Sequence, residues 1–346
     1  MGARRGLACL LGATLSVSAA AAAPKGEPVV LRLGTTAPEG SPYLDAVQKM
    51  SRYAEKETGG ALSVRVVASG LLGSENDMVE ALRHDRLDAW CGSVGAAVAA
   101  VPELAAIELP FLFRDAAEVD RAIPAMHGHL RAAARDRGLT YLGFTHVGFR
   151  HLGTKTPVTT LAELRRLRLR SQPNPVHAEL WKALGVRHVP VGLPDVPREL
   201  EAGTVDAFDS AIVWMFATGW HVFVKHLTRT AHIYQPGVCL LGAAARARLP
   251  APVVRRLERA FDLSALRLTD LGICVNCAAA RRIEGELATS LPGMGIAVHD
   301  VDADLRARME QLAEPVRAGW RKAATPRGRA LLDAVVSVLA KGRRDP

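Results

Sequence analysis

Segments typical of strands and of helices alternate along most of this chain. Residues 28–35 (PVVLRLGT) and 62–68 (LSVRVVA) have the apolar content and the alternation of strands. Between them, residues 41–57 place apolar side chains at helical spacing, and Gly59 and Gly60 follow as a stop signal. Repeated strand–helix units predict an α/β fold with mainly parallel sheets.

The same pattern continues through the rest of the chain. We expect further strands at 87–93, 140–147, 148–155, 165–171, 187–191, 205–209 and 295–301, extended segments at 108–113 and 231–243, and helices at 74–85, 115–136, 175–184, 194–202, 212–225 and about 250–288, with two more helices at the end. A chain of 346 residues with 49% hydrophobic residues is long enough for two lobes, and no low-complexity linker separates them. The expected architecture is therefore two lobes with a cleft between them.

Residues 1–23 are predicted to be a signal peptide and not part of the fold. Arg4 and Arg5 precede an apolar stretch, and the alanines from Ala19 to Ala23 provide a cleavage site of the A-x-A type. A transmembrane anchor is the alternative, but the stretch is short for one and ends in small residues. We therefore expect an exported protein, located in the periplasm if the cell has two membranes.

The net charge does not indicate a nucleic-acid partner. The formal charge is +9, and removal of the two arginines of the signal peptide lowers it to +7. The other arginines are scattered along the chain, without a basic stripe interleaved with aromatic residues. We expect no nucleic-acid partner, and charge spread in this way mostly serves solubility.

Four cysteines follow the signal peptide, which is too few for a disulfide scaffold in a chain of this length. Two of them form CVNC at 274–277, a C-x-x-C that allows a redox interpretation. Its position inside a predicted long helix, without a second C-x-x-C or a nearby histidine, favours buried small residues instead. The histidines have no metal-ligand spacing, and G-x-S-x-G, H-E-x-x-H and a G-x-G-x-x-G after a strand are absent. We expect no enzyme activity, no cofactor and no metal site.

The predicted strand 165–171 (RRLRLRS) carries arginines among apolar residues, with Arg166, Arg168 and Arg170 on one face. Arg170 ends the strand, and ligands of open α/β sheets bind beyond the carboxyl ends of strands. A guanidinium there suits a carboxylate, because it offers paired donors and keeps its charge. For Arg166 and Arg168, a solvated strand face is the simpler interpretation.

Five stretches of the chain resemble one known family in order and spacing. They are SGLLGSE (69–75), LPFLFRD (109–115), GFRHLGTK (148–155), LAELRRLRLRSQPNPVHAELWKALG (161–185) and ELEAGTVDAFDS (199–210). The resemblance is to substrate-binding proteins of tripartite ATP-independent periplasmic (TRAP) transporters, of the DctP type, and covers about residues 29–325. It implies a two-lobed periplasmic binding protein fold with a ligand cleft between the lobes and a long connecting helix.

The resemblance also implies which residues meet the ligand. Arg170 matches the arginine that clamps the ligand carboxylate in that family, and Arg150 matches the arginine that supports the same anion or another ligand group. Two structural ion pairs are the alternative for these arginines. The expected ligand-contacting residues are Arg170, Arg150, Ser210, Trp214, Leu193, Ser93, Glu75, Asp209 and Phe149.

Three positions depart from the family's pattern. Ser210 replaces an asparagine that contacts ligand, Leu193 stands where an aromatic residue often packs on the ligand, and Ser93 stands where a sugar-acid-binding branch has an acid. The site therefore offers fewer polar partners than the hydroxyl groups of a sugar acid need.

The predicted helix 212–225 is rich in aromatic residues. Phe216, Trp220 and Phe223 share one face, which we expect to lie in the core. Trp214 points elsewhere and is a candidate wall of the ligand site.

These patterns predict a ligand-binding transport protein. We expect it to capture a small organic anion, a carboxylate with an apolar or aromatic body, and to deliver it to the TRAP membrane permease subunits. The alternatives are a more lipophilic ligand with a tetratricopeptide-repeat helper protein, or a sensory binding protein that hands its ligand to a receptor. One lobe is expected from 24–147 plus 236–295 and the other from 148–235 plus 296–346, and a homodimer stays open.

Overall fold

The structure is a computed structural model, and it describes residues 27–257 and 277–344. The predicted signal peptide lies outside these residues, as do Cys274 and the side chain of Cys277. The interpretations of the signal peptide and of the C-x-x-C therefore stay predictions. Within the described ranges, no helix combines the length and the apolar character needed to cross a membrane.

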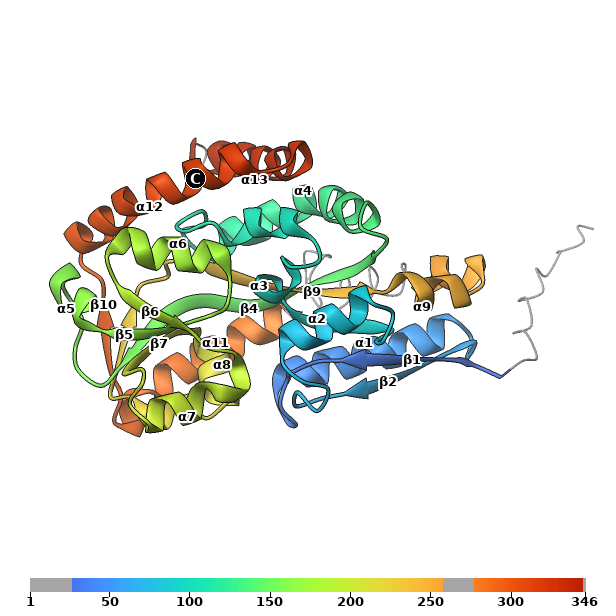
Figure 1. Cartoon of the computed structure of the whole chain (residues 1–346), viewed down its shortest axis with the longest axis horizontal. Helices are drawn as coiled ribbons and strands as arrows, with labels where there is room; N and C mark the ends of the chain where they lie inside the picture. Colours follow the sequence, from blue (N-terminus) through green and yellow to red (C-terminus); the bar gives the residue numbers. More distant parts are fainter. Residues whose placement is uncertain (1–26, 258–276, 345–346) are drawn as a thin grey trace, which may run out of the picture.

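The described strands of the first lobe form one sheet (Figure 1). Their order is β2 (Leu62–Val67), β1 (Val29–Gly34), β3 (Ala89–Ser93), β9 (Tyr234–Leu241) and β4 (Thr140–Thr154). β1 pairs in parallel with β2 and β3, as strand–helix repeats predict, whereas β9 pairs antiparallel with β3 and β4.

The helices of this lobe are α1 (Pro42–Glu57), α2 (Glu75–Arg83), α3 (Val94–Ala97), the 3-10 helix η1 (Pro102–Glu108), α4 (Ala116–Arg135) and α9 (Ala243–Arg248). Apolar side chains of α1 and α9 form one core of this lobe, and those of α2, η1 and α4 form another.

The second lobe builds its sheet on the later part of β4. β7 (Ala207–Ala211) and β8 (His226–Arg229) pair antiparallel with β4, and β10 (Ala297–Asp300) pairs in parallel with β8. β5 (Arg168–Ser171) lies in parallel between β7 and β6 (Arg187–Pro190). The helices of this lobe are α5 (Leu161–Arg166), α6 (Pro175–Leu184), η2 (Leu193–Asp195), α7 (Val196–Glu201), α8 (Ile212–Ala217) and η3 (Trp220–Phe223).

β4 joins the two lobes. It pairs first with β9 and then with β7, and the change follows a register shift between His146 and Gly148. Gly148 has a φ of 127°, a conformation that glycine adopts without steric cost. The predicted strands 140–147 and 148–155 are therefore one continuous strand, and Arg150 lies just beyond its irregular point.

The C-terminal helices cover both lobes on one side of the molecule (Figure 1). α12 (Ala303–Ala323) packs against α6 of the second lobe, and α13 (Pro326–Arg344) packs against α4 and η1 of the first. α11 (Cys277–Ser290), followed by η4 (Pro292–Met294), packs against α8 and β4. The lobe boundaries stay a prediction, although α13, which we expected in the second lobe, packs on the first.

Two segments differ from their expected form. The segment 108–113, expected to be extended, is the end of η1 followed by a turn, in which Phe111 has a φ of 55° and donates its N–H to the His232 carbonyl. The expected helix 212–225 stops early, because Gly219 takes a left-handed conformation with a φ of 74°. η3 and β8 follow in its place.

Helix caps explain a third difference. Thr160 and Glu163 form a capping box that starts α5, so the first residues of the expected strand 165–171 are helical and the strand begins at Arg168. The long helix expected over 250–288 is described at its two ends only, since residues 258–276 lie outside the described ranges.

A disulfide lies in the sheet of the first lobe. Cys91 on β3 and Cys239 on β9 stand opposite each other in the antiparallel register, with Cα atoms 4.2 Å apart and fully buried side chains. The bond links positions separated by 148 residues in sequence. The cysteine count predicts that the fold is not a disulfide scaffold, and a single disulfide is compatible with that prediction. The sequence alone did not indicate this bond.

Candidate functional site

Arg170 lies at the carboxyl end of β5, where the sequence predicts it, and only 1% of the residue is exposed. Its Nε and one terminal nitrogen, Nη2, donate to the Val191 carbonyl oxygen over 2.9 and 2.6 Å. The guanidinium carbon lies 5.0 Å from the centroid of the Trp220 ring. Burial, followed by the charge of Arg150, lowers the pKa of Arg170 to about 9, so the side chain is still a cation at neutral pH.

This buried cation has no close anion in the described part of the chain. Arg170 forms no ion pair with any described residue, whereas Arg150 pairs with Asp209. Glu75 and Asp209 raise the pKa of Arg170 through their charges alone. A buried charge without a paired counter-charge is unfavourable, so the site favours the entry of an anion.

A small pocket of about 30 Å³ lies beside Arg170. Both lobes contribute to it, so it lies in the cleft between them. The first lobe supplies Ser74, Glu75 and Asn76, and the second supplies Arg170, Gln172, Pro173, Gly192 and Leu193. A space of this size holds a few heavy atoms, such as a carboxylate group.

Glu75 brings a carboxyl group to this pocket from the first lobe. Its Oε1 accepts from the Ser93 backbone N–H over 2.8 Å, and its Oε2 accepts from the Ser93 hydroxyl over 2.6 Å. Burial raises the pKa of Glu75, and this effect outweighs the two hydrogen bonds and the Arg170 charge, which lower it. The pocket therefore combines a fixed cation with a carboxyl group that gains a proton more readily than usual.

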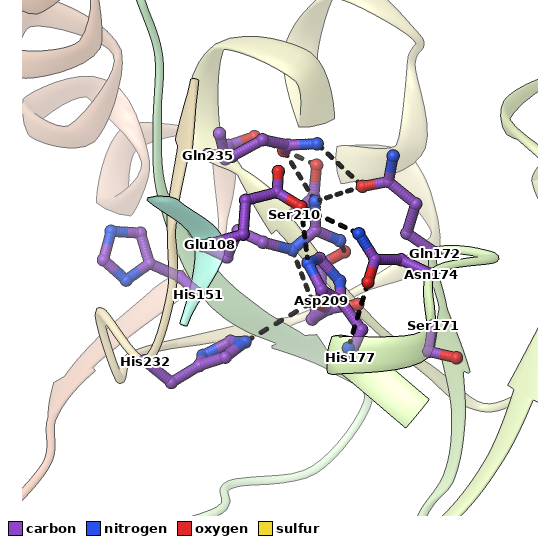
Figure 2. Close-up of polar contacts among 12 residues, drawn as sticks. Glu108, His151, Ser171, Gln172, Asn174, His177, Asp209, Ser210, His232 and Gln235 are labelled. Atoms are coloured by element: carbon purple, nitrogen blue, oxygen red, sulfur yellow. Dashed lines mark hydrogen bonds and ion pairs between the residues drawn. The ribbon is translucent and has the colours of Figure 1, made fainter. Parts of the chain in front are cut away.

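Arg150 is occupied within its own surroundings. Its Nε donates to Asp209 Oδ2 over 2.5 Å, and Nη2 donates to the Asp209 carbonyl oxygen over 2.7 Å. Nη1 donates to the side-chain oxygens of Gln235 and Gln172 over 2.6 and 3.2 Å. Figure 2 shows the polar groups gathered around this cluster. The ion-pair alternative accounts for these contacts, and a contact of Arg150 with a ligand stays a prediction.

Asp209 balances the charge of Arg150 and is fully buried. Burial would raise the pKa of Asp209, but the Arg150 charge and the His232 hydrogen bond outweigh it and hold the pKa well below its ordinary value. His232 Nε2 lies 3.4 Å from Asp209 Oδ2 (Figure 2). His232 Nδ1 lies 2.7 Å from Thr230 Oγ1. Burial lowers the pKa of His232. Asp209 therefore orients Arg150 from within the second lobe.

Six of the nine expected contact residues do not line the pocket: Arg150, Asp209 and Ser93, described above, and Trp214, Ser210 and Phe149. Trp214 packs across the lobe interface on Tyr43, with ring centroids 5.8 Å apart. The Ser210 hydroxyl donates to the next residue's carbonyl oxygen over 3.1 Å, and Phe149 packs on Tyr234 with centroids 5.2 Å apart. The structure thus brings Arg170, Glu75 and Leu193 together at the pocket, with Ser93 one hydrogen bond behind. Ligand contact stays a prediction for all nine residues.

Sequence reasoning missed four residues of this region. Gln172 and Asn174 follow Arg170 in the loop after β5, so the strand-end rule that selected Arg170 also applies to them. Trp220 is buried as expected, but its contact with Arg170 has no sequence signal. Gln235 lies on β9, far along the chain, and only the fold brings it to Arg150.

The arrangement is suited to binding and orienting an anion. It offers a fixed guanidinium, a carboxyl group, a side-chain amide and the apolar surfaces of Leu193 and Pro173. Across residues 27–257 and 277–344, no group of three or more His, Cys, Asp or Glu side chains is placed to hold a metal ion.

The chain matches one protein family over most of its length. Residues 33–323 match the DctP family model, described as bacterial extracellular solute-binding protein, family 7. A solute-binding protein of Verminephrobacter eiseniae is 29% identical over 298 residues, which cover 84% of this chain and 85% of that protein. The C4-dicarboxylate-binding periplasmic protein DctP of Rhodobacter capsulatus is 26% identical over 315 residues, covering 90% and 92%.

A solved structure agrees with the fold. A TRAP periplasmic solute binding protein of Bordetella bronchiseptica, with density attributed to pantoate, shares 25% identity and a TM-score of 0.78 over 88% of this chain and 98% of that one. This similarity confirms the predicted two-lobed α/β fold, and the family match confirms the resemblance drawn from the sequence. The chain belongs to the DctP family of extracellular solute-binding proteins, the substrate-binding components of TRAP transporters.

Proposed function

We propose that this protein captures a small organic anion between its lobes and delivers it to the membrane permease of a TRAP transporter. Arg170 carries the proposal. It is a buried guanidinium on the wall of the pocket and lacks an ion pair with any described residue. A ligand carboxylate bound there would supply the missing counter-charge.

The hydrogen bonds of Arg170 indicate how the carboxylate binds. Nε and one N–H of Nη2 are committed to the Val191 carbonyl, which fixes the plane of the guanidinium. The remaining edge, formed by the outer N–H groups of Nη1 and Nη2, offers two parallel donors. This edge matches the two oxygens of a carboxylate, a geometry that a lysine ammonium does not reproduce.

The remaining walls of the pocket favour a compact acid with an apolar body. Leu193 and Pro173 provide apolar surface, and the Glu75 carboxyl group provides a partner for a hydroxyl group. Pantoate has this composition, with a carboxylate, two hydroxyls and a dimethyl centre, and the similar Bordetella structure has density attributed to it. Since the pocket of about 30 Å³ holds little more than the carboxylate, the lobes must separate further than in this structure to admit the rest of such an acid. We take pantoate as the first candidate and a binding role without catalysis as the function.

The location proposed is the periplasm, after export by the signal peptide predicted at 1–23. Proteins of the DctP family are periplasmic, as the Rhodobacter relative illustrates. The buried disulfide between Cys91 and Cys239 supports this location, because such bonds persist in oxidising compartments outside the cytoplasm.

Thermal unfolding with a ligand panel tests the proposal. At one hundred times its dissociation constant a ligand adds about 2.7 kcal/mol to the free energy of unfolding. We expect pantoate to raise the melting temperature and its neutral lactone, which lacks the carboxylate, to leave it unchanged. Equal shifts with the acid and the lactone would reject the carboxylate clamp, and a large shift with D-glucuronate alone would replace the compact acid by a sugar acid.

A further inference from the structure

Two side-chain amides of the second lobe, Gln172 and Asn174, reach the first lobe across the cleft. Both lie in the loop between β5 and α6 and are buried, with 7% and 4% exposed. The Gln172 oxygen binds Arg150 of its own lobe and Gln235 of β9, the Asn174 oxygen binds within its own lobe, and each residue donates its nitrogen to the first lobe. We propose that Gln172 and Asn174 are positioning residues that latch the two lobes in the closed arrangement.

The orientation of Gln172 follows from its neighbours. Its Oε1 accepts from Arg150 Nη1 over 3.2 Å and from Gln235 Nε2 over 2.7 Å. Since arginine only donates, the amide oxygen must face Arg150. The amide nitrogen therefore points away from Arg150 and donates to the Ser93 hydroxyl oxygen of the first lobe over 2.9 Å.

Ser93 completes a one-way chain of hydrogen bonds between the lobes. Its Oγ accepts from Gln172 and from the Ala96 backbone N–H, which is 3.3 Å away, and donates its proton to Glu75 Oε2. A hydroxyl group has one proton and two lone pairs, and all three are used here. The chain runs from the Arg150 cation to the Glu75 carboxyl group, and its link between Gln172 and Ser93 exists only while the lobes are together.

The Asn174 side chain is oriented in the same way as that of Gln172, by the hydrogen bonds that its oxygen accepts. Its Oδ1 caps α6 by accepting from the backbone N–H groups of Val176 and His177 over 2.8 and 3.4 Å. The amide nitrogen is thereby turned to the first lobe, where it donates to the buried Glu108 Oε2 over 2.9 Å. Both donors of the latch are thus oriented before the lobes meet.

Gly95 on α3 allows this close approach. A Cβ added at Gly95 would lie 2.6 Å from Gln172 Nε2 and 2.9 Å from Gln172 Cδ. Gly95 is in a helix, where alanine is normally the better residue. An alanine at this position must therefore displace the Gln172 amide and break its hydrogen bond to Ser93.

The latch is tested by the distance between the lobes in the protein without added ligand. Lys49 of α1 and Lys182 of α6, whose side chains are 55% and 75% exposed, are replaced by cysteine and spin-labelled. Pulsed electron–electron double resonance then measures the distance between the two labels. Cys274 and Cys277 are replaced by serine in every variant.

The variants are Gln172→Glu, which keeps an oxygen for Arg150 but loses the donor to Ser93, and Gly95→Ala. Their matched controls are Gln311→Glu on the exposed face of α12 and Gly128→Ala in α4, where an added Cβ meets nothing within 4 Å.

We expect the wild type and both controls to show a short-distance component that corresponds to the closed structure. Gln172→Glu and Gly95→Ala should lower the ratio of closed to open protein about tenfold, the effect of losing one buried hydrogen bond. A wild-type distribution without the short component, or one that both variants leave unchanged, would overturn the latch. Because no ligand is added, failure of pantoate to bind would not affect this result.

Discussion

Replacement of Arg150 by alanine is expected to lower the free energy of unfolding by about 3–5 kcal/mol, because it leaves a buried carboxylate without its cation. Asp209 is fully buried and receives hydrogen bonds from Arg150 at both its side chain and its carbonyl oxygen. Gln172 and Gln235 lose a charged donor in the same variant. The expected loss is therefore that of a broken buried ion pair and not of a surface contact.

The loss of stability in Arg150→Ala is also expected to depend on pH. In the wild type the pKa of Asp209 is depressed, so its contribution to stability is complete above the ordinary aspartate value of about 3.9 and is lost as the pH falls below it. Without Arg150, burial raises the pKa of Asp209, so the folded variant binds a proton more readily than the unfolded chain. The destabilisation of Arg150→Ala should then be largest at neutral pH and shrink as the pH falls.

Urea unfolding followed by circular dichroism at pH 7 and pH 5 measures both effects. The double variant Arg150→Met/Asp209→Leu, which removes both charges, should lose less stability than Arg150→Ala. Arg168→Ala is the control, since its pair with Asp206 is partly exposed and worth about 0–1 kcal/mol. A loss below about 1 kcal/mol for Arg150→Ala, or a loss independent of pH, would refute the role assigned to Arg150.

Three further predictions follow from the site and the sheet. Replacement of Cys91 and Cys239 by serine should lower the free energy of unfolding by about 2–5 kcal/mol, and an unchanged urea midpoint would show that the bond does not stabilise the fold. Binding of the anion should weaken above about pH 9, because Arg170 then loses the proton that makes it a cation; calorimetry from pH 7 to 10 with constant affinity would contradict this. Trp220→Leu should weaken anion binding by about 1 kcal/mol, roughly fivefold, through loss of the ring on Arg170, and an unchanged dissociation constant would speak against that contact.

Local patterns in the sequence are sufficient to predict several strands and helices of the fold and the position of one residue of the candidate site. The strands β1 and β2 and helix α1 follow from apolar spacing and stop signals, which act over a few residues. Arg170 followed from its place at the end of a strand, and the structure finds it buried there beside a pocket. The continuity of β4 was missed, because Gly148 looks like a break in sequence but serves as a bend within one strand.

The contacts made across the chain were beyond the reach of sequence patterns. Arg150 looks like a second ligand clamp in its segment, yet its partner Asp209 lies 59 positions away, and only the pairing of β4 with β7 brings them together. The disulfide depends in the same way on the antiparallel pairing of β3 and β9. The role proposed for Gln172 depends on its hydrogen bond to the Ser93 hydroxyl, which belongs to the other lobe.

Calorimetric titration of Arg170 variants measures whether this guanidinium holds the ligand carboxylate. The titrant is pantoate, or whichever acid of the panel gives the largest thermal shift. Arg170→Ala should weaken binding by at least about 2 kcal/mol, roughly thirtyfold. Arg170→Lys should fail to restore it, and Arg168→Ala should bind as the wild type does. If the affinity of Arg170→Ala stays within about threefold of the wild type, the buried guanidinium does not hold the ligand carboxylate.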